Sequence, residues 1–451
     1  MKRFFTFIFI VLASVSFAGI FDDVLEEKPP KYIFLFIGDG MASPQRMVAD
    51  EFARHSGHDR LVINKMPYHG TTRTGSISSL VTDSAASGTA IACGEKTYNG
   101  AIGIAKDGKR HLVSVAEVAK KKGMKVGIIT TVTINHATPA AFYAHRTKRS
   151  QYYEIGLDLV ASGFDFFAGS GVTHSNNKKS KLYKGDINDL AKKAGYTVLG
   201  RKDDFSVLKS GKGKVLINVP LPYEIDRHSY DPFTLAKFTE MGIDFLDNKN
   251  GFFMMVEGGK IDYAGHANDA ATNLREVLAF DDAVKVAMDF AKKHPDETLI
   301  IVTGDHETGG MTMGFAATGY AMYMERLAYQ KCSVAEFHGK LKNAMTENKN
   351  FSFEDAKLLL TKYFGFRFDG KDKDPMQINA KELKQLSEAF KNGKLPHAAR
   401  LVMAAKAGIG WSTGAHTALP VLTTASGKMA EKFSGFYENT DISNRLKEIL
   451  K

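Results

Sequence analysis

The stretch GFFMMVEGGKIDYAGH, residues 251–266, joins an apolar run to a group of polar side chains, and its pattern decides the fold class. Near-continuous apolarity over such a run is typical of a β-strand that is buried on both faces of a sheet. Glu257, Asp262 and His266 follow the run, and all three are side chains that bind divalent cations. The stretch therefore predicts a buried strand with cation ligands at its carboxyl end.

Further apolar runs of the same kind alternate with helical patterns along the chain. They are YIFLFIG (32–38), KVGIITTV (125–132), FDFFAG (164–169), KVLINV (214–219), TLIIVTG (298–304) and LPVLTT (419–424). Helix-like segments such as 112–123 and 231–248 lie between them, and in the second we expect Asp231 to be the N-cap and Pro232 the first helical residue. The alternation predicts an α/β protein with a doubly wound, mostly parallel central sheet and helices on both faces.

Residues 315–410 interrupt this alternation with a helical, charged pattern that includes AKLLLTKYFGF and ELKQLSEAFKNG. A chain of 451 residues can form one large α/β domain or two ordinary ones, and length alone does not decide between them. We expect a single catalytic domain over 19–451, with 315–410 as a helical insertion or cap within it.

The chain begins with the features of a secretory signal peptide at 1–18. Lys2 and Arg3 precede an apolar stretch at 4–17, and a small residue, Ala18, marks the expected cleavage site. The apolar stretch is shorter than the roughly 20 residues that a membrane-spanning helix needs. We therefore expect a periplasmic or secreted protein without a membrane anchor.

Composition excludes several classes of protein and partner. With 44% hydrophobic and 24% charged residues, the chain is neither disordered nor fibrous. The formal charge is +10, but the lysines are scattered and lack interleaved aromatic residues, so we expect a solvated basic surface and no nucleic-acid partner. Cys93 and Cys332 are too few for a disulfide framework, and either one bridge or two buried thiols fits the sequence.

Several apolar runs finish in cation ligands. These ligands are Asp39, His136, Glu257, Asp305 and His306. Ligands in open α/β sheets bind beyond the carboxyl ends of the strands, so we expect these side chains to gather at one edge. Asp262 and His266 are spaced i, i+4 and share one face of a helical turn, which is a common start of a zinc site, although a solvated helix start has the same spacing. Nitrogen and oxygen ligands with almost no thiolate suit zinc together with magnesium or manganese.

A candidate nucleophile lies in VTDSAASGTAIACG, residues 81–94. The small residues after Ser84 favour a helix, which places Ser84 near a helix N-terminus, where backbone N–H groups favour an anion. A serine at this position is far more often a plain N-cap. The surrounding ligands are what make a catalytic role for Ser84 competitive.

Six segments in this order resemble the alkaline phosphatase family. They are IGDGM (37–41), TDSAASGTA (82–90), NHATPAAFYAHRTKR (135–149), VEGGKIDYAGH (256–266), TGDHETGG (303–310) and GAHT (414–417). The resemblance covers residues 31 to about 314 and the C-terminal part, and the ordered set is very specific. It implies hydrolysis of phosphate monoesters, two zinc ions, one magnesium ion and a homodimer.

The same resemblance implies roles for individual residues. Ser84 would be the nucleophile that becomes phosphoserine, and Arg149 would clamp two phosphate oxygens with its planar fork. The implied ligands are Asp39, Asp305 and His306 for the zinc beside Ser84; Asp262, His266 and His416 for the zinc at the leaving oxygen; and Asp39, Thr138 and Glu257 for magnesium. A pair of metals can stabilise the attacking and leaving oxygens together, which an ordinary serine needs in order to attack phosphorus.

Two positions depart from the best-known bacterial pattern of the family. His136 stands where that pattern has Asp, which leaves open whether His136 contributes to the magnesium site, recruits another metal or is a packed loop histidine. Tyr263 stands where family members vary, so a phosphate contact there stays open.

The same residues leave other functions open beside a phosphomonoesterase. A phosphodiesterase of the same superfamily is the nearest, although Arg149 and the third-metal residues favour a terminal phosphate. This sequence lacks the Cys or Ser motif that is oxidised to an aldehyde in sulfatases, which argues against a sulfatase. A mutase of the same superfamily would normally be cytoplasmic, and the expected signal peptide argues against that. A secreted metal- or phosphate-binding protein without turnover is the alternative of another class, and such a protein has no use for Ser84.

Overall fold

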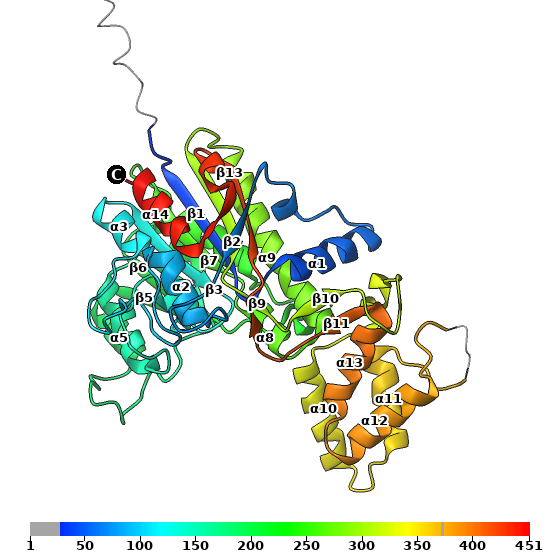
Figure 1. The fold of residues 1–451 in the computed structure, drawn as a ribbon. Coiled ribbons are helices and arrows are strands. Elements are labelled where there is room, and N and C mark those ends of the chain that lie inside the picture. The colour runs from blue at the N-terminus through cyan, green and yellow to red at the C-terminus, as the bar shows by residue number, and fades with distance from the viewer. Residues whose placement is uncertain (1–27, 371–373) are drawn as a thin grey trace, which may run out of the picture.

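A ten-stranded sheet forms the centre of the protein, in the order β14-β2-β13-β8-β1-β7-β3-β4-β6-β5 (Figure 1). This computed structural model describes residues 28–370 and 374–451, so the expected signal peptide at 1–18 lies outside the described residues. The strands are β1 Tyr32–Gly38, β2 Tyr68–Arg73, β3 Lys125–Thr130, β4 Phe166–Gly169, β5 Tyr196–Gly200, β6 Lys214–Asn218, β7 Phe252–Glu257, β8 Thr298–Gly304, β13 Val421–Gly427 and β14 Gly435–Glu438. In this sheet β13 is antiparallel to β8 and β2, and the other pairings are parallel. The predicted mostly parallel α/β sheet is confirmed.

Each central strand supplies two hydrophobic cores because successive side chains point to opposite faces of a sheet. In β1, Phe34 and Phe36 enter one core, whereas Ile33 and Leu35 enter the other. All four are fully buried. The continuous apolarity of this strand follows from its cover on both faces.

Helices cover both faces of the sheet. The first face packs against α1 Ser43–His55, α7 Leu235–Leu246 and α9 Ala270–Ala291. The second packs against α2 Ser84–Cys93, α3 Val115–Lys121, α5 Tyr152–Ser162, α6 Ile187–Lys193 and α14 Asn439–Ile449. The short helices α4 Ala137–Ala140 and α8 Lys260–His266 follow β3 and β7 at the carboxyl edge. The short 3-10 turns are η1 Val62–Asn64, η2 Phe205–Ser210, η3 Glu224–Asp226, η4 Met324–Tyr329 and η5 Ala430–Phe433.

Between β8 and β13 the chain leaves the sheet and forms a lobe of helices (Figure 1). The lobe contains α10 Val334–Glu347, α11 Phe353–Phe364, α12 Ala380–Lys391 and α13 Leu395–Ala407. At its base, β10 Met311–Met313 pairs antiparallel with β11 Ile409–Trp411. A second ribbon pairs β9 Glu307–Thr308 with β12 His416–Thr417. The two ribbons return the chain from the lobe to the carboxyl edge of the sheet.

The start of α7 differs from the expectation. Its N-cap is Thr234, whose side chain accepts a hydrogen bond from the Lys237 backbone N–H, and the helix begins at Leu235. Asp231 instead accepts a hydrogen bond from Arg201 at 2.7 Å and one from the Phe233 backbone N–H at 3.1 Å. The expected N-cap at Asp231 was wrong because this carboxylate closes a turn ahead of the helix.

Two further features concern the cysteines and the length of the helices. Cys93 and Cys332 are both buried free thiols. Among the helices that the structure describes, none combines the length and hydrophobicity that a membrane-spanning segment requires.

Candidate active site

The carboxyl edge of the sheet gathers the ligands that the sequence placed at strand ends. Asp39 follows β1, Glu257 ends β7, and Asp305 with His306 follows β8. Three groups of carboxylates and histidines there have ligand atoms within 4.8 Å of one another. The groups are Asp39 with Asp305 and His306, Asp39 with His136 and Glu257, and Asp262 with His306 and His416. Asp39 belongs to two groups, and so does His306, which places the three groups side by side.

Ser84 is the first residue of α2, and its hydroxyl faces the first of these groups. Asp83 is the N-cap of α2 and accepts a hydrogen bond from the Ala86 backbone N–H at 3.0 Å. The Ser84 Oγ lies 3.2 Å from the His306 Nε2, which in turn is 3.4 Å from one oxygen each of Asp39 and Asp305. Because Asp83 caps the helix, the Ser84 hydroxyl is not used as a cap and points at the ligands.

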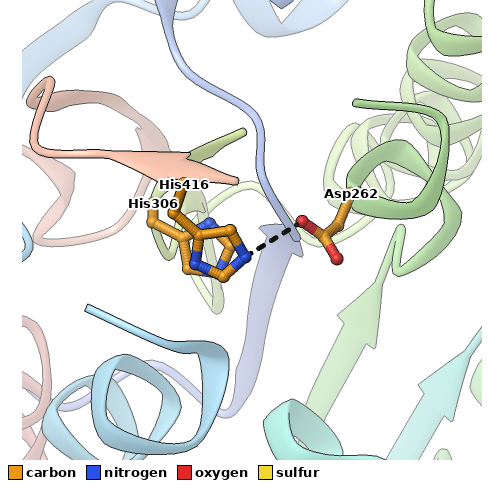
Figure 2. Close-up of side chains that lie close together, drawn as sticks. All are labelled: Asp262, His306 and His416. Atoms are coloured by element: carbon orange, nitrogen blue, oxygen red, sulfur yellow. Dashed lines mark ion pairs between the residues drawn. The ribbon is translucent and has the colours of Figure 1, made fainter. Parts of the chain in front are cut away.

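His416 reaches the site through the β9–β12 ribbon, in which it pairs with Thr308. Its ring stacks on that of His306 with centroids 3.6 Å apart, and its Nε2 lies 3.5 Å from Asp262 Oδ1 (Figure 2). His266 completes this corner, with its Nε2 3.1 Å from that of His416 and 3.4 Å from Asp262 Oδ2. The i, i+4 pair of α8 therefore shares a face, as its spacing predicts, and meets a histidine from far along the chain.

Backbone carbonyls fix the orientation of two of these histidines. The Nδ1 of His416 lies 2.8 Å from the Thr82 carbonyl oxygen, and that of His266 lies 2.7 Å from the Gly414 carbonyl oxygen. A carbonyl only accepts hydrogen bonds, so Nδ1 donates in both rings and Nε2 is the ring atom that faces the site. The two Nε2 atoms, 3.1 Å apart, are therefore the atoms that a shared cation would contact.

The third group lies at the ends of β3 and β7. Thr130 donates a hydrogen bond to Glu257 Oε2, while Glu257 Oε1 is buried without a partner. Thr138, on α4, is buried with its hydroxyl beside the Glu257 carboxylate. His136 precedes α4 and is also buried, and its Nδ1 has no hydrogen-bond partner.

Arg149 extends over the same cluster from the loop before α5. Its Nη1 donates to Asp83 Oδ2 at 3.1 Å, and its Nη2 lies 3.0 Å from the His136 Nε2. Burial and the nearby Arg149 charge lower the pKa of His136 to about 3. His136 is therefore neutral at physiological pH and accepts from Arg149, which it helps to hold in place.

Negative charge in the cluster exceeds the positive charge of the described side chains. Burial and the carboxylates of Asp305 and Asp262 raise the pKa of Asp39 well above its usual range. Burial also raises the pKa of Glu257 to about 8 and that of Asp305 to about 7. Burial acts in the same direction on Asp262, but the contacts with His416 and the neighbouring histidines lower its pKa.

Divalent cations fit this donor set. Both oxygens of Asp39, Glu257 Oε1 and Asp305 Oδ2 are buried without a hydrogen-bond partner. A buried polar atom in a native protein normally has a partner, and oxygens aimed at a common point are satisfied by a metal ion. The residues present therefore suit metal ions at all three groups.

Some residues of the site were not anticipated from the sequence. Asp83 anchors Arg149, Thr130 supports Glu257, and Thr308 donates to Asp262 Oδ1 at 2.6 Å. Asp83 and Thr308 lie inside TDSAASGTA and TGDHETGG, so their positions beside a nucleophile and a ligand were visible in the sequence. Their hydrogen bonds required the fold.

A doubly wound sheet whose carboxyl edge holds a buried serine among three groups of carboxylates and histidines is the arrangement of a metal-dependent hydrolase. Known proteins narrow this class. The family model "Alkaline phosphatase" matches residues 30–451. Alkaline phosphatase 4 of Bacillus subtilis is 34% identical over 443 residues, which cover 93% of this chain and 88% of that protein. The chain belongs to the alkaline phosphatase family.

Solved structures agree with this assignment. A cold-active alkaline phosphatase from a psychrophilic Shewanella species superposes with a TM-score of 0.78 at 30% identity, covering 93% of this chain and 100% of that one. A mutant alkaline phosphatase from the Antarctic bacterium TAB5, with a histidine replaced by aspartate and Mg bound in its M3 site, gives a TM-score of 0.68 at 29% identity. That comparison covers 94% of this chain and 99% of the TAB5 chain.

Proposed function

We propose that the protein hydrolyses phosphate monoesters with Ser84 as its nucleophile. The observation that carries this proposal is the Ser84 hydroxyl, which is free of the helix cap and lies 3.2 Å from a histidine whose neighbours are the unpartnered oxygens of Asp39 and Asp305. The alkaline phosphatase family is one of metal-dependent phosphomonoesterases, and the match over nearly the whole chain places this enzyme in that activity class.

The metal ligands divide into three sets. Asp39, Asp305 and His306 would hold a zinc ion beside Ser84; Asp262, His266 and His416 a second zinc; and Asp39, Thr138 and Glu257, with His136 next to them, a magnesium ion. When bound, these ions supply positive charge beside the attacking and leaving oxygens, which is what phosphoryl transfer chiefly requires.

The chain's own residues then perform the steps. Arg149, held by Asp83 and His136, donates two N–H groups to phosphate oxygens and fixes the phosphorus in front of Ser84. Ser84 Oγ loses its proton to solvent and attacks the phosphorus, the bond to the ester oxygen breaks on the opposite side, and a phosphoserine forms while the leaving oxygen takes a proton from water. Water then attacks the phosphoserine and releases inorganic phosphate and Ser84. Arg149 would take up two non-bridging oxygens and the metal groups would address a third, which a diester carries as an ester link, so the set as a whole favours a terminal phosphate.

His136 bears on the identity of the third metal. Magnesium prefers oxygen ligands, and an imidazole nitrogen does not suit it. The TAB5 mutant, in which a histidine became aspartate and Mg is bound in the M3 site, supports the view that a carboxylate favours Mg in such a site. His136→Asp should therefore lower the magnesium concentration for half-maximal activity about tenfold, measured by titrating magnesium into zinc-loaded enzyme. Unchanged magnesium dependence would remove His136 from the third site.

Kinetics with matched substrates test the function. The mature protein is assayed on a chromogenic phosphate monoester, a diester and a sulfate ester, before chelation, after it and after zinc return. We expect the monoester to be the preferred substrate, and Ser84→Ala to lower its turnover by about a thousandfold or more. Monoester turnover that survives thorough chelation or the loss of Ser84 would overturn the proposal. A diester rate above the monoester rate would favour a phosphodiesterase, and tight metal binding without turnover a binding protein.

We also propose that the enzyme is exported, that residues 315–410 form a cap within one domain, and that the protein is a homodimer. Export rests on the pattern of residues 1–18, and the dimer on family resemblance. Mass spectrometry of the secreted protein should find an N-terminus at Gly19. Light scattering after gel filtration should give twice the monomer mass.

A further inference from the structure

Glu307 is a fully buried carboxylate that belongs to none of the three ligand groups, although it lies between residues of two of them. It directly follows His306, and in the β9–β12 ribbon it pairs with Thr417. Thr417 in turn directly follows His416. Figure 2 shows His416 reaching from β12 onto the ring of His306. Glu307 therefore lies where the chain returns from the lobe to the site.

Four hydrogen-bond donors converge on the Glu307 carboxylate. Oε1 accepts from the Gln45 side chain at 2.7 Å and from the Met311 backbone N–H at 3.0 Å. Oε2 accepts from the Gly310 backbone N–H at 3.0 Å and from the Thr417 hydroxyl at 2.5 Å. This one carboxylate thus joins α1, the turn before β10, and β12. We call Glu307 and its four donors the Glu307 clamp.

The clamp uses the whole hydrogen-bonding capacity of the carboxylate. An ionised carboxylate accepts at about four lone-pair sites and donates nothing, and all the partners of Glu307 are donors. A shift of the buried group would leave a donor or an oxygen without a partner, which costs free energy in a water-free interior. The position of Glu307 is therefore well defined, and so are the segments that donate to it.

The turn between β9 and β10 brings the returning chain close to the clamp. Gly309 and Gly310 have φ angles of +96° and +57°, which glycine adopts most easily. A Cβ on Gly310 would lie 1.8 Å from Ser412 Oγ, and one on Gly309 would lie 2.5 Å from the ring of Trp411. The returning segment therefore packs directly on this turn.

The ligands at the end of β8 are fixed by the sheet itself. Asp305 and His306 directly follow this central strand, and Asp305 Oδ1 accepts from the Gly40 backbone N–H at 3.1 Å. His416, in contrast, belongs to β12, a strand of two residues in a separate ribbon. The place of His416 therefore depends on how firmly that ribbon is held.

We propose that Glu307 is a positioning residue for the metal at the leaving oxygen and that it holds His416 in place through Thr417. The inference rests on the proposed function, in which Asp262, His266 and His416 hold the second zinc ion. The Thr417 hydroxyl fixes β12 next to the ligand, so the imidazole is in place before an ion binds. A ligand that is fixed in advance loses less conformational entropy on binding, so the clamp raises the zinc affinity of this set.

Two substitutions of Thr417 test this role. Thr417→Val keeps a branched side chain but loses the hydroxyl donor, whereas Thr417→Ser keeps the donor. Zinc is titrated into chelated protein in competition with a chromogenic chelator, which measures affinity independently of turnover. In Thr417→Val we expect one zinc ion to bind about tenfold more weakly, while the other zinc ion and magnesium bind as in the wild type. Thr417→Ser should bind every ion as the wild type does.

Wild-type zinc affinity in Thr417→Val would overturn the proposal, and so would an equal loss at all three ligand sets. A control is Thr239→Val, which removes a buried hydroxyl of α7 that donates to the Leu235 carbonyl oxygen at 2.9 Å. It should leave every affinity unaltered. The same fall in Thr239→Val would assign the loss to general loosening and overturn the positioning role. If Thr417→Val does not fold, Glu307→Gln takes its place, because its amide N–H groups face donors, and the same selective loss is expected.

Trp411, the only tryptophan of the chain, reports on the clamp in the absence of metal. In chelated protein, acrylamide should quench its emission more strongly in Glu307→Gln than in the wild type, because the returning segment loosens from the turn. If the wild type binds no zinc, or turns over monoesters independently of Ser84, the proposed function fails. The clamp is then judged by quenching: a rise in Glu307→Gln supports it, and unchanged quenching refutes it.

Discussion

Glu257 and His266 lie in one short segment but face different groups of ligands. Glu257 presents its unpartnered oxygen to Asp39 and His136, whereas His266 meets Asp262 and His416. Glu257→Gln should therefore lower bound magnesium and slow turnover while about two zinc ions remain per chain. His266→Ala should cost about one zinc ion, because the loss of one of three protein ligands leaves a poor site.

Metal analysis of the purified variants by mass spectrometry checks this division. Lys260→Gln, in the same segment, does not belong to any of the three groups of ligands and should retain all the ions. Equal zinc loss in Glu257→Gln and His266→Ala would show that the segment serves one metal and would refute the division.

At the scale of an element, Asp83 at the N-terminus of α2 links the stability of the helix to the proposed phosphate contact of Arg149. One carboxylate oxygen caps the helix through the Ala86 N–H, and the other holds Arg149. Asp83→Asn keeps an acceptor for the cap but loses the ion pair, whereas Asp83→Ala loses both. We expect the free energy of unfolding of Asp83→Ala to be about 1 kcal/mol lower than that of Asp83→Asn. Urea titration of the two variants measures this difference.

Both Asp83 variants should bind inorganic phosphate several-fold more weakly, because Arg149 loses an anchor. Inhibition constants for phosphate in the monoester assay give this value. Tighter inhibition would show that the removed negative charge matters more than the position of Arg149. Equal stability of the two variants would contradict the capping role.

Helix α9 is tied to η1 by a buried carboxylate whose titration should be visible in stability. Asp281 accepts hydrogen bonds from the backbone N–H groups of Val62 and Ile63 at 3.0 Å each, and burial raises its pKa to about 6. The folded protein holds this proton more tightly than the unfolded chain, so stability falls as the pH rises from about 4 to about 6 and then levels off. Asp281→Asn has no carboxyl group to titrate at this position, so its stability does not show this fall.

The stability of Asp281→Asn relative to wild type should rise by roughly 1 kcal/mol between pH 5 and pH 7.5, measured by urea unfolding in metal-saturated buffer. Glu240→Gln, which removes an exposed carboxylate of α7, should show no such change. A difference between Asp281→Asn and wild type that does not vary with pH would contradict the buried titration.

The strands that could be predicted from the sequence are those with a continuous apolar run, which indicates burial on both faces of the sheet. The apolar runs at 32–38 and 298–304 coincide with β1 and β8. Strands β2, β5 and β14 were missed because their sequences, YHGTTR, YTVLG and GFYE, alternate or are short and partly exposed. Local sequence also cannot show that β13 runs antiparallel, because strand direction depends on the path through the lobe.

For the whole molecule, the site could be predicted to the extent that its residues follow strands or share known motifs. Spacing alone predicted the shared face of Asp262 and His266, whereas the implied ligand role of His416 came from the family resemblance. Nothing local to His416 predicts that the β9–β12 ribbon returns it to His306. The hydrogen bonds of Glu307 were equally invisible, because their donors lie on segments that meet only in the folded chain.

The whole fold should depend on its metal ions, since its centre concentrates negative charge. Four carboxylates converge at the carboxyl edge, several of their oxygens lack partners, and the Nε2 atoms of His266 and His416 face each other. Ions that bind only the folded state stabilise it by mass action, so their removal lowers the free energy of unfolding.

Chelation at pH 8 should lower the melting temperature by about 10 °C or more, and zinc with magnesium should restore it. Scanning calorimetry of wild type and Ser84→Ala should give the same loss, because Ser84 does not belong to any of the three proposed ligand sets. His266→Ala should lose less on chelation, since one of its ions is already gone. A melting temperature unaffected by thorough chelation would mean that the cluster is stable without cations, and the assignment of its buried oxygens to metals would fail with it.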